Sequence, residues 1–121
     1  MVEAPNPHRI FTFVPAKDFE VSTRFYRAMG FGVSNADGVR FVELGNFGFL
    51  LQDFYVKKWA DNFMMSMHVD DAQWWVDRHA SIVGGYPRTW NREPELQDWG
   101  QLVAYFTDPS GVLWHVSQTP V

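Results

Sequence analysis

GVLWH at residues 111–115 repeats the pattern of GFLLQ at residues 48–52, and the two segments lie 63 residues apart. Asp18 and Asp71, which each precede a helical pattern, lie only 53 residues apart, so the second half carries an insertion of 10 residues. Residues 86–100 are the obvious place for it. A repeat of this length predicts two copies of one supersecondary unit, each too small to bury its own sheet.

The first half reads as a strand, a helix and three further strands. Residues 10–14 (IFTFV) are rich in β-formers, and we expect a strand that Pro15 stops. Asp18 is a predicted helix N-cap and Gly30 a predicted C-cap, with apolar side chains spaced four residues apart between them. Hairpin turns at Asp-Gly and Gly-Asn pairs separate the three later strands. These strands are predicted at residues 32–35, 39–44 and 47–52.

The same order begins again after a mixed connection at residues 54–62. We expect a strand over residues 63–69 and a helix over 72–83 that Asp71 caps and Gly84-Gly85 stops. Two later strands, at residues 101–106 and 112–117, are joined by the turn sequence DPSG at 108–111.

The predicted fold is therefore α+β, with two repeated β-α-β-β-β modules whose sheets pair into one curved, mixed surface. We expect a single domain over residues 1–121, in which the modules occupy residues 9–53 and 63–118.

Composition narrows the function. With 121 residues and 46% hydrophobic side chains, the chain can bury one real core. Its apolar stretches of about five residues are far shorter than a membrane span, and residues 1–8 lack the apolar region of a signal peptide, so we expect a cytoplasmic protein with no membrane partner. The absence of cysteine excludes thiolate nucleophiles and cysteine-bound metals. A net charge of −4 without a basic stripe argues against nucleic acid and favours a neutral or cationic small ligand.

The aromatic content is unusually high, at 17%, and includes six tryptophans. A core of this size cannot bury all six tryptophans, so several are expected to line a pocket or an interface. Trp90 and Trp99 are the strongest candidates because they fall in the predicted insertion rather than on a periodic element.

Several short motifs resemble one known superfamily. STRFY at residues 22–26, VDD at 69–71 and DPSG at 108–111 look like the vicinal-oxygen-chelate superfamily, which includes glyoxalases, bleomycin-resistance proteins and dioxygenases, and this likeness covers about residues 10–118. GYPR at 85–88 and PELQDWG at 94–100 closely resemble the bleomycin-resistance branch. The resemblance implies the same two-module fold and a protein that binds a drug rather than transforms it.

The metal site of the superfamily's enzymes is expected to be missing. Carried over through the repeat, its four ligand places fall on Phe11, Gln52, Met64 and His115. Phe and Met cannot supply the nitrogen or oxygen ligands that such a metal requires. We therefore expect no cofactor. If a metal did bind, Gln52, His68 and His115 are the residues left to hold it.

Without a metal, the curved sheet becomes an aromatic trough suited to stacking on planar rings. The acids Asp37, Glu93, Glu95 and Asp98 are expected to add negative charge at its rim. The resemblance also implies a homodimer with two grooves, each lined by both subunits. The chain departs from the relatives at Arg40, near a place where they carry a groove aromatic, and at Asn62, where another Trp is expected. The predicted ligand-binding residues are Phe11, Phe41, Gln52, Trp59, Met64, Trp90, Trp99 and His115.

Three functions remain open at this point. The first is sequestration of a bulky aromatic antibiotic of bleomycin type, for resistance or self-protection. A metal-dependent enzyme of glyoxalase or dioxygenase type with a remodelled site is the second. The third is a module that binds a peptide or a biosynthetic partner in the groove. The sequence contains no Gly-x-Ser-x-Gly elbow and no phosphate-binding glycine loop that would point to other chemistry.

Overall fold

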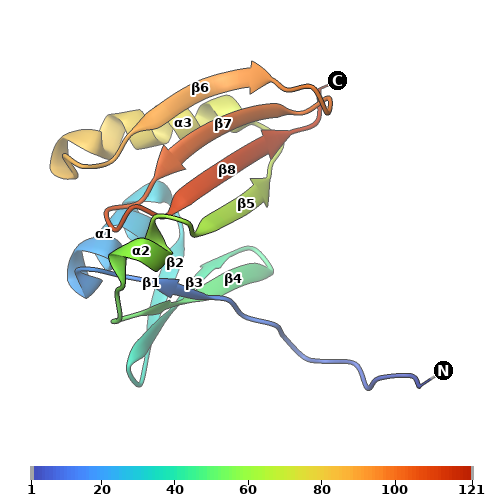
Figure 1. The fold of residues 1–121 in the computed structure, drawn as a ribbon, viewed down its shortest axis with the longest axis vertical. Coiled ribbons are helices and arrows are strands. Elements are labelled where there is room, and N and C mark those ends of the chain that lie inside the picture. The colour runs from blue at the N-terminus through green and yellow to red at the C-terminus, as the bar shows by residue number, and fades with distance from the viewer. Residues whose placement is uncertain (1, 121) are drawn as a thin grey trace.

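Each half of the chain folds into a four-stranded sheet with a helix on one face (Figure 1). The structure is a computed structural model that describes residues 2–120; Met1 and Val121, the ends of the predicted domain, lie outside the described residues. The first module consists of β1 (Phe13–Pro15), α1 (Phe19–Met29), β2 (Gly32–Ala36), β3 (Val39–Leu44) and β4 (Phe47–Gln52). The second consists of β5 (Met64–His68), α3 (Ala72–Ile82), the 3-10 helix η1 (Val83–Gly85), β6 (Asn91–Leu96), β7 (Leu102–Thr107) and β8 (Leu113–Gln118). A short helix, α2 (Lys57–Ala60), joins them.

The predicted class and the two modules are confirmed. Within residues 2–120 the strands form two sheets of order β1-β4-β3-β2 and β5-β8-β7-β6. Both are mixed, because β1 and β5 pair in parallel with β4 and β8, whereas the other pairs are antiparallel. The two sheets are separate hydrogen-bonded units, and each therefore has an outer face of its own.

The predicted helix caps are confirmed. Asp18 accepts a hydrogen bond from the Val21 N–H at 3.1 Å, and Asp71 accepts one from the Trp74 N–H at 3.1 Å. Gly30 ends α1 in the left-handed region, with φ 110°. The prediction that Gly84-Gly85 stops the second helix directly was wrong, because α3 ends at Ile82 and the chain continues as η1 through both glycines.

Two strand predictions were also wrong. β1 spans Phe13–Pro15 rather than residues 10–14, and it includes the proline that was expected to stop it. An edge strand tolerates this proline because one side of its backbone needs no N–H donor. Residues 86–100, predicted as an inserted loop, contain the strand β6. Its register shifts between Arg92 and Glu95, which places Pro94 in a bulge, where a strand accommodates proline.

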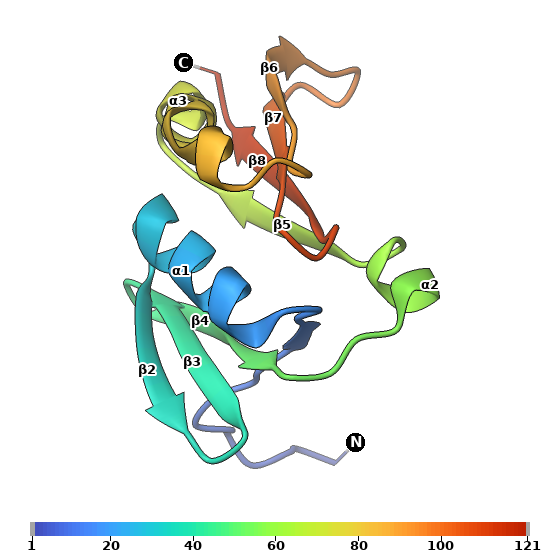
Figure 2. The same cartoon turned by 90° about the vertical axis from the view of Figure 1, so that its left-hand side faces the viewer.

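One core joins the two modules. In Figure 2, α1 covers one face of the first sheet, α3 covers one face of the second, and the two helices contact each other. Trp114 of β8 lies between the modules: its ring centroid is 5.6 Å from Phe31, 5.6 Å from Phe49 and 5.7 Å from Phe106. Since these rings come from both halves of the chain, neither module completes its core alone.

A buried polar network reinforces this junction. The Tyr26 hydroxyl donates to the Asp108 carboxylate at 2.6 Å, and the Trp114 Nε1–H donates to Tyr26 Oη at 3.1 Å. The other Asp108 oxygen accepts the N–H groups of Ser110 and Val112, at 2.8 and 3.0 Å. Burial raises the pKa of Asp108 to about 6 in spite of these donors. Burial and the nearby carboxylate likewise raise the pKa of Tyr26.

Candidate functional site

Side chains alternate along each strand between an inner face that packs on a helix and an outer face. In the first sheet, Val42, Phe49 and Leu51 are buried in the core, so their neighbours along the strands point outward. The register confirms this, because Leu50 is paired with both Phe13 and Phe41. We call this surface the first outer face; it consists of Phe13, Val39, Phe41, Leu50 and Gln52, with Phe11 packed edge-on to Phe41 at 5.6 Å.

The second sheet has an equivalent surface. Its inner face carries Phe106, Trp114 and Val116, which are buried, so the residues between them point outward. We call this surface the second outer face; it consists of Met64, Ser66 and His68 on β5, Arg92 on β6, Val103, Tyr105 and Thr107 on β7, and Leu113, His115 and Ser117 on β8. Trp90 joins this face just before β6, where its N–H donates to Thr107 Oγ1 at 3.0 Å.

A polar row crosses the second outer face at one level. Ser66 is paired with His115, His115 with Tyr105, and Tyr105 with Arg92. The His115 and Tyr105 rings are 4.8 Å apart, and the Arg92 guanidinium lies 5.9 Å from the Tyr105 ring and 6.0 Å from the Trp90 ring. His115 Nε2 is buried, and within residues 2–120 it has no hydrogen-bond partner.

The structure divides the predicted ligand-binding residues between two surfaces. Phe11, Phe41 and Gln52 lie on the first outer face, whereas Met64, Trp90 and His115 lie on the second. The remaining two stand apart: Trp59 is on α2, where it is 65% exposed, and Trp99 follows β6, also 65% exposed. One chain thus carries these residues on two separate surfaces, and their common role in ligand binding stays a prediction.

The residues present do not fit a metal centre. Phe11 and Met64 occupy two of the four expected ligand places, and Gln52 belongs to a different sheet from His68 and His115. Across residues 2–120, no three His, Asp or Glu side chains group closely enough to hold a metal ion.

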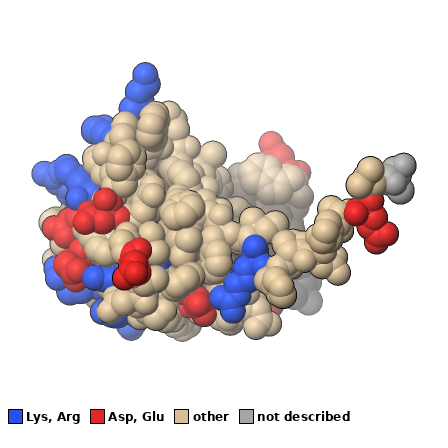
Figure 3. Space-filling view, turned by 90° about the horizontal axis from the view of Figure 1, so that it is seen from below, with Lys and Arg blue, Asp and Glu red and all other residues tan. Residues whose placement is uncertain are grey.

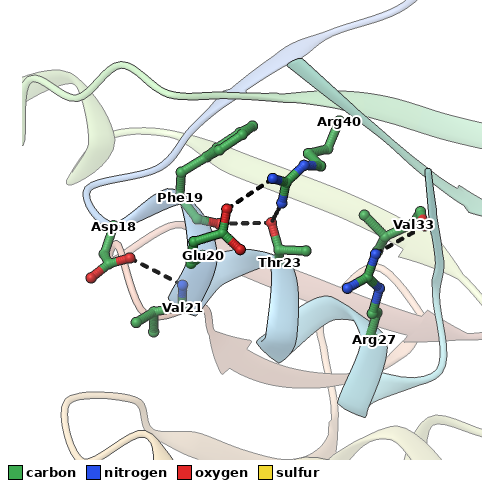
Figure 4. Close-up of polar contacts among 8 residues, drawn as sticks. All are labelled: Asp18, Phe19, Glu20, Val21, Thr23, Arg27, Val33 and Arg40. Carbon is green, nitrogen blue, oxygen red and sulfur yellow. Dashed lines mark hydrogen bonds and ion pairs between the residues drawn. The ribbon is translucent and has the colours of Figure 1, made fainter. Parts of the chain in front are cut away.

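Arg40 does not take the place of a groove aromatic. It points inward to α1, where its guanidinium donates to Thr23 Oγ1 at 2.7 Å and to Glu20 at 2.8 Å and lies over the Phe19 ring (Figure 4). The hydrogen bond from Arg40 lowers the pKa of Glu20. Its alternation with Phe41 puts Arg40 on the inner side of the sheet, whereas Phe41 lies on the first outer face.

Two further polar residues have structural roles. Glu93, predicted at the rim of the groove, instead accepts a hydrogen bond from Gln73 of α3 at 2.6 Å, on the helix side of the sheet. His79 is buried: its Nε2 lies 3.1 Å from the Thr107 carbonyl, and the Asn91 amide donates to its Nδ1 at 2.9 Å. Burial lowers the pKa of His79.

An apolar cleft of about 440 Å³ lies between the modules and is lined by residues of both faces of β5. Of the predicted site residues, His68 alone lines it. The other lining side chains are those of Phe31, Leu44, Phe47, Phe49, Met65, Ser66, Met67, Val69 and Trp114. Most of these belong to the shared core or pack against it, so the cleft marks the junction of the modules.

The distribution of surface charge agrees with the absence of a basic stripe in the sequence. On the face of the first module shown in Figure 3, basic and acidic side chains are interspersed, and the described residues drawn there form no basic stripe. None of the helices formed by residues 2–120 has the length and apolar character needed to span a bilayer.

Comparison with known proteins identifies the family, although no protein-family model matches the chain. The bleomycin resistance protein of Klebsiella pneumoniae is 32% identical over 116 residues, an alignment that covers 87% of each protein. The chain belongs to the bleomycin resistance protein family. The crystal structure of the bleomycin resistance determinant encoded on transposon Tn5 shares the fold, with a TM-score of 0.76, 25% identity, and coverage of 95% of this chain and 100% of that one. A bleomycin-binding protein crystallised with bleomycin superposes with a TM-score of 0.77 at 22% identity, covering 94% of this chain and 100% of that one.

Membership of the bleomycin resistance family confirms the predicted branch. Two residues of the second outer face, Arg92 and Tyr105, were not predicted from the sequence. Arg92 was overlooked because its strand was interpreted as part of an inserted loop. Tyr105 was overlooked although its strand was predicted correctly. Its spacing against His115 across the DPSG turn was the available signal, since the hairpin register pairs the two residues.

Proposed function

We propose that this protein binds and sequesters a bulky, planar aromatic antibiotic of bleomycin type and does not transform it chemically. The proposal depends mainly on Phe11 and Met64, apolar side chains where a chelating enzyme of this fold would need metal ligands. Family membership supports it, because the relative in Klebsiella pneumoniae is a bleomycin resistance protein. Capture is a sufficient mechanism of resistance: a bound drug is withdrawn from its target in proportion to the affinity and the amount of protein.

Exposed aromatic side chains supply the binding energy in this proposal. Trp90, 46% exposed, offers a ring face on the second outer face, and the half-buried Phe41 offers one on the first. Planar ligands gain from offset stacking on such rings and from the apolar area that both partners bury. Since each outer face is open on one side, a ligand stacked on a single face would stay half in water.

A homodimer would close the site. β1 and β5 are edge strands, and they carry the exposed apolar residues Phe13, 52% exposed, and Met64, 61% exposed. Residues 2–10 are exposed and extend away from the first sheet (Figure 1). We propose that the first outer face of one subunit and the second outer face of its partner enclose each ligand, which gives two sites per dimer, and that the dimer acts in the cytoplasm.

Phe13→Glu is expected to convert the dimer into a monomer. The substitution places a charge on an edge strand that the proposed interface would bury, at a cost of several kcal/mol. Size-exclusion chromatography with light scattering would report the mass. Trp74→Glu is the matched control, because Trp74 is 49% exposed but lies on α3, away from both edge strands, and this variant should stay dimeric. A monomeric wild-type protein at micromolar concentration would contradict the dimer.

Trp90→Ala is expected to weaken binding of a stacked drug about tenfold, since one aromatic stacking contact is worth about 1–3 kcal/mol. The measurement is a titration of tryptophan fluorescence with metal-free bleomycin and with quinoline and quinoxaline compounds. In the wild type, at least one of these should quench the emission saturably. Trp74→Phe provides the control, because Trp74 lies on the helix side.

Two outcomes would contradict the proposed function. The first is an absence of binding across the whole panel. The second is a stoichiometric content of zinc, nickel, manganese or iron in protein purified without chelators, which would favour the metal-dependent enzyme instead.

A further inference from the structure

The polar row of the second outer face is built for a ligand, because its functional groups have no protein partners. His115 Nε2 is buried without a hydrogen bond. The ion pairs among residues 2–120 involve Arg9, Arg40 and Lys57, so Arg92 is in none of them. A molecule that covers Arg92 must pair with its guanidinium or leave this charged group unsatisfied, which costs about 1–3 kcal/mol or more.

The positive charge of the Arg92 guanidinium favours a molecule with a negative charge. The guanidinium lies beside the Trp90 and Tyr105 rings, at 6.0 and 5.9 Å, and these contacts hold the cation over the outer face. The nearest carboxylate in the same strand that shares this face is Glu95, which lies beyond the bulge and forms no ion pair with Arg92 within residues 2–120. The row therefore carries a local positive charge in a protein whose net charge is −4.

Stacking and charge pairing can occur together at this place. A planar ring lying on Trp90 or Tyr105 would bring a carboxylate on its edge to the Arg92 guanidinium, which accepts such groups in a bidentate geometry. The Tyr105 hydroxyl is on the neighbouring strand at the same level. His115 is one strand further, at about 5 Å spacing per strand, and because its Nε2 is buried it supports the Tyr105 ring from one side instead of contacting the ligand.

We propose that the preferred ligand is a planar aromatic molecule with a carboxylate on its ring system, which Arg92 and Tyr105 receive. This rests on the proposed function, since it names the ligand class of the same site. It differs from the expectation from net charge, which favoured a neutral or cationic ligand.

The test compares two compounds that differ in one charge, quinoxaline-2-carboxylate and quinoxaline-2-carboxamide, by isothermal titration calorimetry with the intact protein. The carboxylate is expected to bind at least about tenfold more tightly, since a hydrogen bond to a charged group is worth about 1.5–3 kcal/mol. Arg92→Gln should abolish this preference and leave carboxamide binding within about threefold. Tyr105→Phe, which keeps the ring, should reduce the preference in part.

Arg24→Gln is the matched control, because Arg24 is an exposed cation on α1 and its loss changes the net charge equally. It should retain the full preference for the carboxylate. Equal affinities for the two compounds, or a preference that survives Arg92→Gln, would overturn the inference. The fluorescence titration with metal-free bleomycin tests the proposed function separately. If the protein bound bleomycin but showed no preference for the carboxylate, the proposed sequestration would still be supported and the proposed ligand class would be rejected.

Discussion

Trp114→Ala is expected to lower the free energy of unfolding by about 3–5 kcal/mol, the cost of removing a large aromatic side chain from a closed core. Trp114 is 3% exposed and packs against Phe31 and Phe49 from the first module and Phe106 from the second. The substitution would open a cavity where the modules meet. It would also remove the Trp114 Nε1–H group, which donates a hydrogen bond to the Tyr26 hydroxyl in the buried network. Since a domain of this kind has about 5–15 kcal/mol of stability, this loss threatens folding itself.

Urea denaturation followed by far-ultraviolet circular dichroism would measure this loss. Trp99→Ala is the control, because Trp99 is 65% exposed and its removal should change stability by less than about 0.5 kcal/mol. If Trp114→Ala does not unfold the chain entirely, both modules should lose structure in one transition, since their core is shared. A loss below about 1 kcal/mol would show that the rings around Trp114 do not hold the modules together.

Asp108 is expected to make the protein less stable as the pH rises from about 4 to about 6. Its pKa in the folded state is about 6, above its ordinary value of 3.8, because burial disfavours the charged carboxylate. Between these values the folded chain holds a proton that the unfolded chain has lost, so stability falls with rising pH. One unit of difference in pKa corresponds to about 1.4 kcal/mol, so the free energy of unfolding should fall by about 3 kcal/mol over this range.

Asp108→Asn isolates this contribution. The free energies of unfolding of the wild type and the variant would be compared from about pH 4 to about pH 7.5, and their difference should change by about 3 kcal/mol in the stated direction. Comparison with the variant is needed because His79, whose pKa is lowered, loses stability as the pH falls and so gives the opposite slope. Asp37→Asn, in an exposed turn, should reproduce the wild-type profile. Parallel profiles for wild type and Asp108→Asn would refute the role of Asp108.

Local signals in the sequence were sufficient for most of the fold. Asp18, Asp71 and Gly30 are helix caps whose chemistry depends on a few neighbouring residues, so they could be recognised without tertiary information. β6 could not, because its sequence NREPEL contains a proline and several charged residues that are depleted in strands. Its edge position and its bulge, which only the folded sheet reveals, make this composition acceptable.

The types of residue in the candidate site could be predicted from the sequence, but their arrangement on two separate sheets could not. The repeat placed Phe11, Gln52, Met64 and His115 at equivalent positions, and the structure puts each of them in an outer-face region. That these regions belong to separate sheets depends on how the modules pack, which local patterns do not encode. Arg40 shows a related limit. A long charged side chain on the inner face can still reach the surface beside a helix, so its charge does not reveal the direction in which it points.

The alternation along β7 and β8 has a consequence for how this protein can change. Tyr105 and His115 lie outward, whereas their immediate neighbours Phe106 and Trp114 are buried. Substitutions at outward positions such as Tyr105 would therefore alter drug preference while the core residues Phe106 and Trp114 stay unchanged. Descendants of one gene could diversify against new toxins without first acquiring a more stable scaffold.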